Sequence, residues 1–292
     1  MSRFVALGAL MLTTLSCTPI YGELPVERSL LRHRVSITSG DTKEISGYVY
    51  RPQKEGRRPA IVMLHGCSGL FTKKYGRLKT RERAWRDIFL AEGYVVLLLD
   101  SFTERGHRSI CKIPLRNRPV EPDQERPHDA YGALQWLQRQ TFVAPDKIAL
   151  GGWSNGAMSM LWTVLSNAPQ RPGHLVYDFR AAFGFYPGCI KLRTRHPNYT
   201  ALVRTLLLLG ADDNWTWPKP CERLGASATS KGSANVTVKT YKGATHGFDH
   251  PKLKRRTIIG SDGRWVQIGT HQKARKAAIR RIKSYLRNAF AT

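Results

Sequence analysis

The feature that most constrains the fold is an alternation of short apolar runs with longer helical segments. Three of the runs, at 61–64, 95–99 and 206–209, contain only aliphatic residues or Met. Continuous runs of this kind are typical of parallel strands that are buried on both faces. We predict strands at 34–38, 46–51, 60–64, 94–100, 147–152, 181–186, 205–209 and 236–241, and helices at 81–92, 126–139, 155–165 and 273–289. The repeated order of strand, helix and strand predicts an α/β fold with a doubly wound, mostly parallel sheet of about eight strands.

The first two predicted strands differ from the others because polar and apolar residues alternate along them. Only a short polar segment, 39–42, separates them, so we expect an antiparallel hairpin at one edge of the sheet. Hydrophobic residues make up 41% of the chain, which is too large a share for a disordered protein. Since no repeat or linker interrupts the alternation, we predict a single domain over 23–292, with a polar loop at 112–126 that covers part of it.

Residues 1–22 are predicted to be a secretory signal peptide. Arg3 is followed by a mostly apolar stretch at 4–15 and then by small and polar residues up to Gly22. A lipoprotein attached through Cys17 is the less favoured alternative, because Thr14 stands where such signals usually have Leu. No later run reaches 18 apolar residues, so no transmembrane segment is predicted. We therefore expect an exported protein, periplasmic or secreted.

Four cysteines remain beyond Cys17, and in an oxidising compartment an even number suggests two disulfides. Cys189 and Cys221 each follow a predicted strand, and those strands should be neighbours. This order favours a Cys189–Cys221 bond and leaves Cys67 to pair with Cys111. Four buried thiols are the alternative that the spacing leaves open.

A sharp turn between a strand and a helix is predicted at Gly152-Trp153-Ser154-Asn155-Gly156. In the nucleophile elbow, a strand turns into a helix and exposes a serine above the sheet, and the flanking glycines avoid a clash in the tight turn. The pattern of three residues is not specific by itself. Its place between a buried strand and an apolar helix makes Ser154 the candidate nucleophile, against the alternative of a purely structural turn.

A serine nucleophile needs a base, and the base needs an acid that orients it. The predicted strand at 205–209 is followed by Asp212 and Asp213, and the strand at 236–241 is followed by His246. Ser, Asp, His is the chain order of α/β-hydrolases. We therefore expect Ser154, Asp213 and His246 to form a catalytic triad, with Asp212 as the competitor for the acid. A metal site at His246 and His250 is not expected because no helix is predicted there, and no cofactor motif is present.

An oxyanion hole would be formed by backbone N–H groups on two loops. One donor is expected from Asn155, which follows the nucleophile. The other is expected from the loop after the strand at 60–64, with Cys67 favoured over Ser68.

The chain resembles the dienelactone hydrolase family of the α/β-hydrolases from about Val35 to its C-terminus. The matching segments are 65–69 (HGCSG), 100–106, the elbow, 186–189 (YPGC), 210–221 and 246–248 (HGF). The resemblance implies an α/β-hydrolase fold and places the acid three residues after Gly210, at Asp213. Dienelactone hydrolases carry Cys at the elbow, whereas this chain carries Ser154. The difference favours a general serine hydrolase of carboxylic esters or lactones that needs no cofactor or metal.

The chain carries 47 Lys and Arg against 21 Asp and Glu, a formal net charge of +26. Such a charge favours contact with anionic surfaces or polysaccharides, although no specific nucleic-acid motif accompanies it. A non-catalytic basic protein of the cell envelope that binds anionic polymers is therefore the alternative function. Pocket walls are expected at 103–124 and 214–233, and the aromatic residues Trp153, Phe185, Trp215 and Trp217 are candidates for the pocket or the core.

Overall fold

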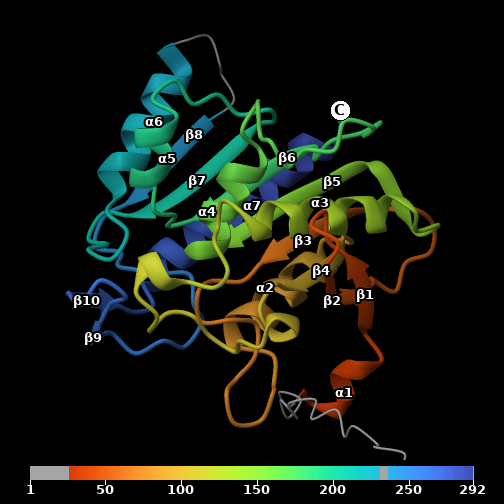
Figure 1. Ribbon diagram of the computed structural model, residues 1–292, viewed down its shortest axis with the longest axis horizontal. Coiled ribbons are helices and arrows are strands. Elements are labelled where there is room, and N and C mark those ends of the chain that lie inside the picture. Colours follow the sequence, from red (N-terminus) through yellow and green to blue (C-terminus); the bar gives the residue numbers. More distant parts are fainter. Residues whose placement is uncertain (1–25, 231–235, 292) are drawn as a thin grey trace, which may run out of the picture.

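The computed structural model describes residues 26–230 and 236–291, so the predicted signal peptide and Cys17 lie outside the described residues. Eight strands form one sheet in the order β1-β2-β4-β3-β5-β6-β7-β8 (Figure 1). β1 pairs antiparallel with β2, and β2 pairs antiparallel with β4, whereas all remaining neighbours are parallel. The predicted α/β class, the strand number and the edge hairpin are confirmed.

The strands of the main sheet are β1 (Arg34–Thr38), β2 (Glu44–Tyr50), β3 (Arg58–Leu64), β4 (Val95–Asp100), β5 (Val143–Trp153), β6 (Ala181–Phe185), β7 (Thr205–Gly210) and β8 (Val236–Tyr241). The main helices are α2 (Thr80–Ala91), α3 (Glu125–Gln138), α4 (Asn155–Thr163), α6 (Pro218–Ser230) and α7 (Gln272–Ala291). Two shorter helices are α1 (Arg28–Leu31) and α5 (Ile190–Arg195). A separate antiparallel hairpin consists of β9 (Arg256–Ile259) and β10 (Trp265–Ile268).

The continuous apolar runs are buried on both faces of the sheet because helices cover each face. In β3, Val62 and Leu64 pack in one core with residues of α3, α4 and α6. Ile61 and Met63 pack in the other core with residues of α2 and α7. Side chains alternate between the two faces of a strand, so an unbroken aliphatic run supplies both cores at once.

The sequence did not predict α1, α5, α6 or the β9–β10 hairpin. Helix α6 begins with Pro218-Lys219-Pro220, which reads as a loop, yet proline is tolerated in the first turn of a helix. The strands β9 and β10 have four residues each and carry exposed charged or polar side chains, so they give no apolar run. None of the described helices is long and apolar enough to cross a membrane.

Candidate active site

Ser154 lies at the turn between β5 and α4, where its backbone adopts a φ of 51°. The left-handed region is unusual for a residue other than glycine and is found where the surrounding structure enforces it. A Cβ on Gly152 would lie 2.4 Å from the carbonyl oxygen of Gly156, and one on Gly156 would lie 2.2 Å from the carbonyl oxygen of Leu64. Both glycines are therefore needed for the strand and the helix to approach so closely.

His246 contacts both of the residues that were expected to work with it. Its Nε2 lies 3.0 Å from Ser154 Oγ, and its Nδ1 lies 2.8 Å from Asp213 Oδ2. This arrangement fits a neutral imidazole whose Nδ1–H donates to the carboxylate, which leaves Nε2 free to accept the serine proton. Asp212, the competitor, is exposed.

Asp213 is held by the residues that follow it. Its Oδ1 accepts hydrogen bonds from the backbone N–H groups of Trp215 and Thr216, both at 2.9 Å. Thr216 Oγ1 lies 3.0 Å from Asp213 Oδ2 and 3.1 Å from His246 Nδ1. Thr216 was not identified from the sequence. The available signal was Asp213 itself, because an Asp side chain commonly accepts hydrogen bonds from the backbone N–H groups two and three residues later in a turn.

The imidazole of His246 lies between two aromatic rings. Its ring centroid is 4.4 Å from that of Tyr186 and 4.8 Å from that of Trp215. These rings and the burial of His246, which is 6% exposed, keep water away from most of its surface. The contacts fix the orientation of the base relative to Ser154.

The two predicted donor loops lie at the same cavity as Ser154. Cys67 and Asn155 both line this cavity, whose volume is about 650 Å³. Asn155 is the first residue of α4, so its N–H has no acceptor within the helix. Cys67 follows Gly66 in a turn closed by a hydrogen bond from Gly69 N–H to the Gly66 carbonyl, at 3.0 Å. The structure thus brings the predicted donors to one place.

A buried guanidinium joins these two loops. Arg126 of α3 is fully buried and donates to Asn155 Oδ1 at 2.6 Å, to the His65 carbonyl at 2.9 Å and to Ser101 Oγ at 3.3 Å. Burial lowers the pKa of Arg126 to about 9, which leaves it charged at neutral pH. We call Arg126, Asn155, His65 and Ser101 the arginine cluster.

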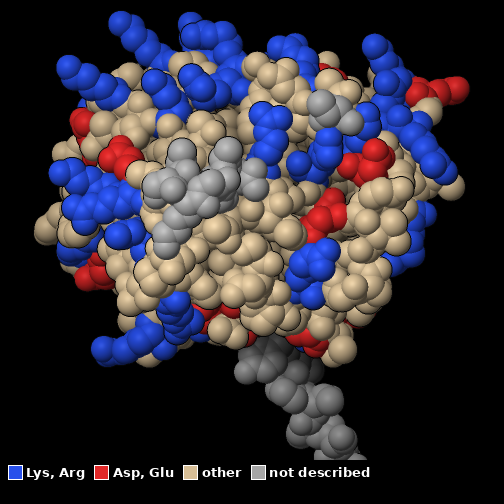
Figure 2. Space-filling view, turned by 90° about the horizontal axis from the view of Figure 1, so that it is seen from above, with Lys and Arg blue, Asp and Glu red and all other residues tan. Residues whose placement is uncertain are grey.

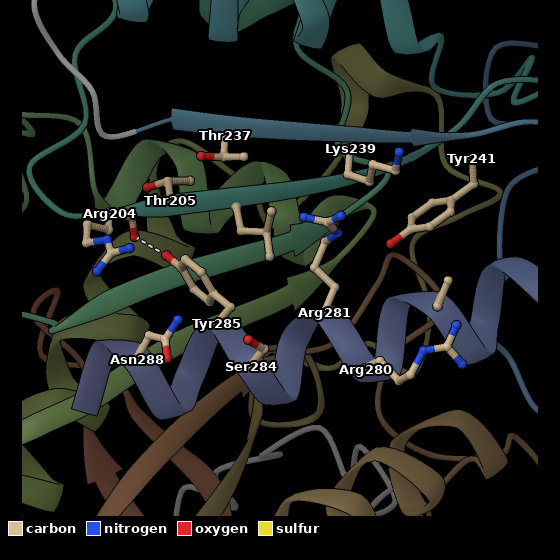
Figure 3. A pocket seen from close by; sticks show the side chains of 12 residues that line it. Arg204, Thr205, Thr237, Lys239, Tyr241, Arg280, Arg281, Ser284, Tyr285 and Asn288 are labelled. Carbon is tan, nitrogen blue, oxygen red and sulfur yellow. Dashed lines mark hydrogen bonds between the residues drawn. The ribbon is translucent and has the colours of Figure 1, made fainter. Parts of the chain in front are cut away.

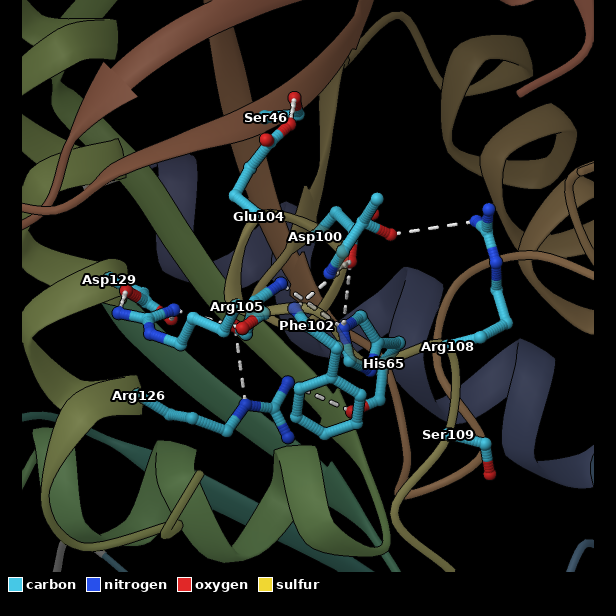
Figure 4. Close-up of polar contacts among 12 residues, drawn as sticks. Ser46, His65, Asp100, Phe102, Glu104, Arg105, Arg108, Ser109, Arg126 and Asp129 are labelled. Atoms are coloured by element: carbon cyan, nitrogen blue, oxygen red, sulfur yellow. Dashed lines mark hydrogen bonds and ion pairs between the residues drawn. The ribbon is translucent and has the colours of Figure 1, made fainter. Parts of the chain in front are cut away.

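The surroundings of the arginine cluster are also polar and buried. Arg105 forms a bidentate ion pair with Asp129 at 2.9 and 3.0 Å beside Arg126 (Figure 4). His65 accepts a hydrogen bond at Nε2 from the Ser101 N–H, and burial holds the pKa of His65 well below its usual value. His65 is therefore neutral at pH 7 and adds no second positive charge beside Arg126.

A buried carboxylate lies behind the other half of the site. Asp249 accepts hydrogen bonds from the indole N–H groups of Trp85 at 2.8 Å and Trp153 at 2.9 Å, and from the Tyr186 hydroxyl at 2.5 Å. Trp153 precedes Ser154, and Tyr186 packs on His246. We call Asp249, Trp85, Trp153 and Tyr186 the aspartate cluster. Neither cluster was predicted, because its members come from separate parts of the chain.

Two disulfides border the cavity with the pairing that the chain order favoured. Cys67 is bonded to Cys111, and Cys189 is bonded to Cys221. The first bond joins the loop after β3 to the segment that leads into the predicted covering loop. The second joins the loop after β6 to α6.

The cavity has apolar walls and a charged rim. Apolar surface comes from Leu115, Met158, Ile190, Trp215 and Trp217. Charged side chains come from the covering loop, from α5 and from the β9–β10 hairpin, namely Arg116, Arg118, Glu121, Lys191, Asp262 and Arg264. Trp215 and Trp217 therefore line the cavity, whereas Trp153 and Phe185 belong to the core. The contribution of the hairpin could not be foreseen, since the hairpin itself was not predicted.

The described residues offer no obvious place for a metal ion: no group of three or more His, Cys, Asp and Glu side chains is arranged to hold one. His250 was considered above together with His246 as a metal site. Its Nδ1 accepts a hydrogen bond from the Lys252 N–H.

Comparison with known proteins shows the family of this chain and the similarity of its fold to solved structures. The sequence model of the dienelactone hydrolase family matches residues 45–290, so the chain belongs to that family. A dienelactone hydrolase candidate from Klebsiella pneumoniae subsp. pneumoniae has a similar structure, with a TM-score of 0.61 and 16% identity over 87% of this chain and 96% of that one. Esterase 2 of Thermogutta terrifontis, in a form phosphorylated by paraoxon, gives a TM-score of 0.61 and 18% identity over 88% of this chain and 94% of that one.

One curated relative matches over a shorter stretch. It is the quorum-quenching protein AidA of Acinetobacter baumannii, which is 27% identical over 133 residues. The match covers 46% of this chain and 39% of AidA.

Proposed function

We propose that this member of the dienelactone hydrolase family is an exported serine hydrolase that cleaves carboxylic esters or lactones through an acyl-enzyme. The observation that carries the proposal is the continuous hydrogen-bonded row Ser154–His246–Asp213, with distances of 3.0 and 2.8 Å. The mature protein is proposed to be a single domain over 23–292. The two disulfides support export, because disulfides persist in oxidising compartments.

In the proposed reaction, Ser154 Oγ attacks the carbonyl carbon of the substrate while its proton moves to His246 Nε2. The imidazolium that forms is stabilised by Asp213, which keeps its own charge. His246 then gives the proton to the leaving alcohol oxygen, and the acyl group stays on Ser154. Water, deprotonated by His246, releases the acid and restores the serine.

The oxyanion of each tetrahedral intermediate is proposed to accept hydrogen bonds from the N–H groups of Asn155 and Cys67. Such donors are fixed in place before the reaction and face charge that develops only in the transition state. The cavity of about 650 Å³ is within the range typical of small-molecule sites, and its apolar walls suit an acyl chain or a lactone ring.

The test is hydrolysis of p-nitrophenyl esters, from acetate to decanoate, and of simple lactones by wild type, Ser154→Ala and Ser166→Ala. Ser166 is an exposed serine outside the cavity and serves as the control. We expect Ser154→Ala to lose at least 1,000-fold in kcat, and Ser166→Ala to keep its activity. A fluorophosphonate probe should label wild type at Ser154 and leave Ser154→Ala unlabelled.

Retained activity in Ser154→Ala would contradict the proposal. A folded wild type that reacts neither with any ester or lactone nor with the fluorophosphonate probe would favour a binding protein on a hydrolase fold instead.

A further inference from the structure

A second hollow lies between the edge of the main sheet and α7. This groove has a volume of about 560 Å³ and shares no lining residue with the cavity at Ser154. Strands β7 and β8 form its floor and one wall, and α7 forms the other wall (Figure 3). Arg204 lies at one end, Lys239 and Arg281 lie in the middle, and Arg280 lies toward the other end.

No acidic residue lines the groove, and among the described residues none of its four cations has a carboxylate oxygen within ion-pair distance. The cavity at Ser154 is different, because Glu121 and Asp262 are among its lining residues. There Lys191 pairs with Glu121, and Arg264 pairs with Asp262. Cations that converge without a counter-ion repel one another, so a bound anion lowers the free energy of the site.

Basic residues are common on this protein, so charge alone does not define a site. Figure 2 shows Lys and Arg scattered toward the rim of one whole face, with few Asp and Glu among them. The groove differs from such a face in two ways. It is concave, and it contains a buried polar group whose hydrogen-bonding capacity the protein does not satisfy.

That group is the hydroxyl of Tyr241. Tyr241 is 8% exposed, and its buried hydroxyl faces the guanidinium of Arg281, which can only donate. The hydroxyl proton therefore has no acceptor among the described residues. Figure 3 shows the hydroxyl pointing toward Arg281. Burial raises the pKa of Tyr241, so the hydroxyl stays protonated and can donate. A buried donor without an acceptor is unfavourable, and an oxygen atom of a ligand would satisfy it.

The groove is also anchored at its other end. The Tyr285 hydroxyl is 2.5 Å from the Arg204 carbonyl oxygen and 3.0 Å from the Ala182 carbonyl oxygen. These contacts fix α7 against β6 and the start of β7, so the spacing between the cations on the helix and those on the sheet is maintained.

We propose that this groove binds a ligand that carries two or more phosphate groups. The guanidinium fork of Arg matches two phosphate oxygens at once, and the groove supplies three Arg and one Lys along its length. Cations spread from Arg204 to Arg280 suit a ligand with several anionic groups better than a single small anion. Tyr241 would donate to one of the phosphate oxygens. The site is independent of ester hydrolysis.

The first test is titration of the full-length protein with inorganic tripolyphosphate by isothermal calorimetry at a fixed ionic strength. The groove variant Arg204→Gln/Arg281→Gln is compared with Lys273→Gln/Lys276→Gln, which removes the same charge from exposed positions of α7 outside the groove. We expect at least tenfold weaker binding for the groove variant and less than twofold for the control. Equal losses would mean that only the overall charge attracts the anion, and would overturn the proposal.

Tyr241→Phe tests the site without changing any charge. Since the hydroxyl donates to no acceptor among the described residues, this variant should keep its melting temperature and bind tripolyphosphate three- to tenfold more weakly. Binding as tight as wild type would contradict the proposed contact.

A second arm replaces tripolyphosphate with vesicles of phosphatidylcholine that contain cardiolipin, a lipid whose headgroup carries two phosphate groups. If the same variants weaken both interactions, the phosphate belongs to a lipid headgroup. If they weaken only tripolyphosphate binding, it belongs to a soluble ligand. No saturable binding of either probe would overturn the site.

Discussion

The arginine cluster and the aspartate cluster lie behind opposite halves of the proposed active site, and they carry opposite charges. Arg126 is a buried cation whose three partners are neutral acceptors, whereas Asp249 is a buried anion whose three partners are neutral donors. The cation lies behind the loops proposed to bind the oxyanion, where negative charge develops. The anion lies behind Tyr186, which packs on His246, where positive charge develops.

The two clusters also differ in how directly they reach the reacting groups. Arg126 contacts the side chain of Asn155 and the loop that leads to Cys67, so it positions both proposed donors. Asp249 acts through Trp153 and Tyr186, which contact the nucleophile and the base in turn. The comparison suggests that electrostatic preorganisation is strongest on the oxyanion side.

Arg126→Met should give the largest effect. The variant leaves the His65 carbonyl and the Asn155 amide without their partner, so both proposed donors lose their position. We expect kcat for p-nitrophenyl acetate to fall at least 100-fold while KM changes less than threefold, because the donors act mainly in the transition state.

Arg105→Met is the control, since it removes a neighbouring, half-buried arginine that pairs with Asp129. Arg105 also donates to the Ser101 carbonyl, but it contacts neither donor loop. It should lower the melting temperature and keep kcat within a few-fold. If both variants lose the same activity, Arg126 serves only the fold.

Asp249→Asn should have a smaller effect on turnover and a clear effect on stability. The Asn amide group brings N–H donors toward three groups that are themselves donors. We expect the free energy of unfolding in urea to fall by about 2 kcal/mol and kcat to fall about tenfold. Asp87→Asn, at an exposed position, is the control. A variant that loses stability but keeps full kcat would separate the aspartate cluster from catalysis.

Tyr186→Phe tests the same comparison, because it keeps the ring that packs on His246 and removes the hydroxyl. That hydroxyl donates to Asp249 and accepts a hydrogen bond from Arg81 at 3.2 Å. We expect kcat to fall about threefold with little change in KM. A loss as large as that of Asp249→Asn would contradict this order of effects and would mean that the hydroxyl, through Asp249 and Arg81 together, matters as much as the carboxylate.

The smallest expected effect is a pH dependence of stability that comes from Lys79, which lies near the arginine cluster. It donates to the Ser68 carbonyl next to the oxyanion loop, and burial lowers its pKa to about 8 from a usual value of 10.5. The unfolded chain therefore binds more protons than the folded one between pH 8 and 10.5, so the Lys79 contribution to stability rises with pH in that window. Urea unfolding at pH 7.5 and 10 should show this gain in wild type relative to Lys79→Met, and an equal gain in both would contradict it.

The sequence was most informative where a local pattern determines the structure. The aliphatic runs identify the parallel strands, and Gly152 and Gly156 mark the turn at Ser154. Because parallel strands end at the same edge of a sheet, the sequence alone predicts that residues after β7 and β8 lie beside that serine.

The two clusters could not be predicted in this way. Arg126 lies on α3 and reaches Asn155 and His65, which are 29 and 61 positions away. Asp249 is 96 positions from Trp153 and 164 from Trp85. Nothing in the local sequence distinguishes a buried Arg from one on the surface of a chain with 47 basic residues. Only packing of the helices on the sheet decides which charges are removed from water.

The bond between Cys67 and Cys111 has a consequence for when the protein becomes active. Cys67 is at once a proposed donor to the oxyanion and one end of a covalent link. The shape of the oxyanion loop is thus completed by an oxidation step after synthesis. A chain still in the reducing cytoplasm would carry Ser154 and His246 but a loop held by weaker contacts alone. For a protein exported as proposed, folding and activation would then be separate events, and the second would wait for the oxidation of these two thiols.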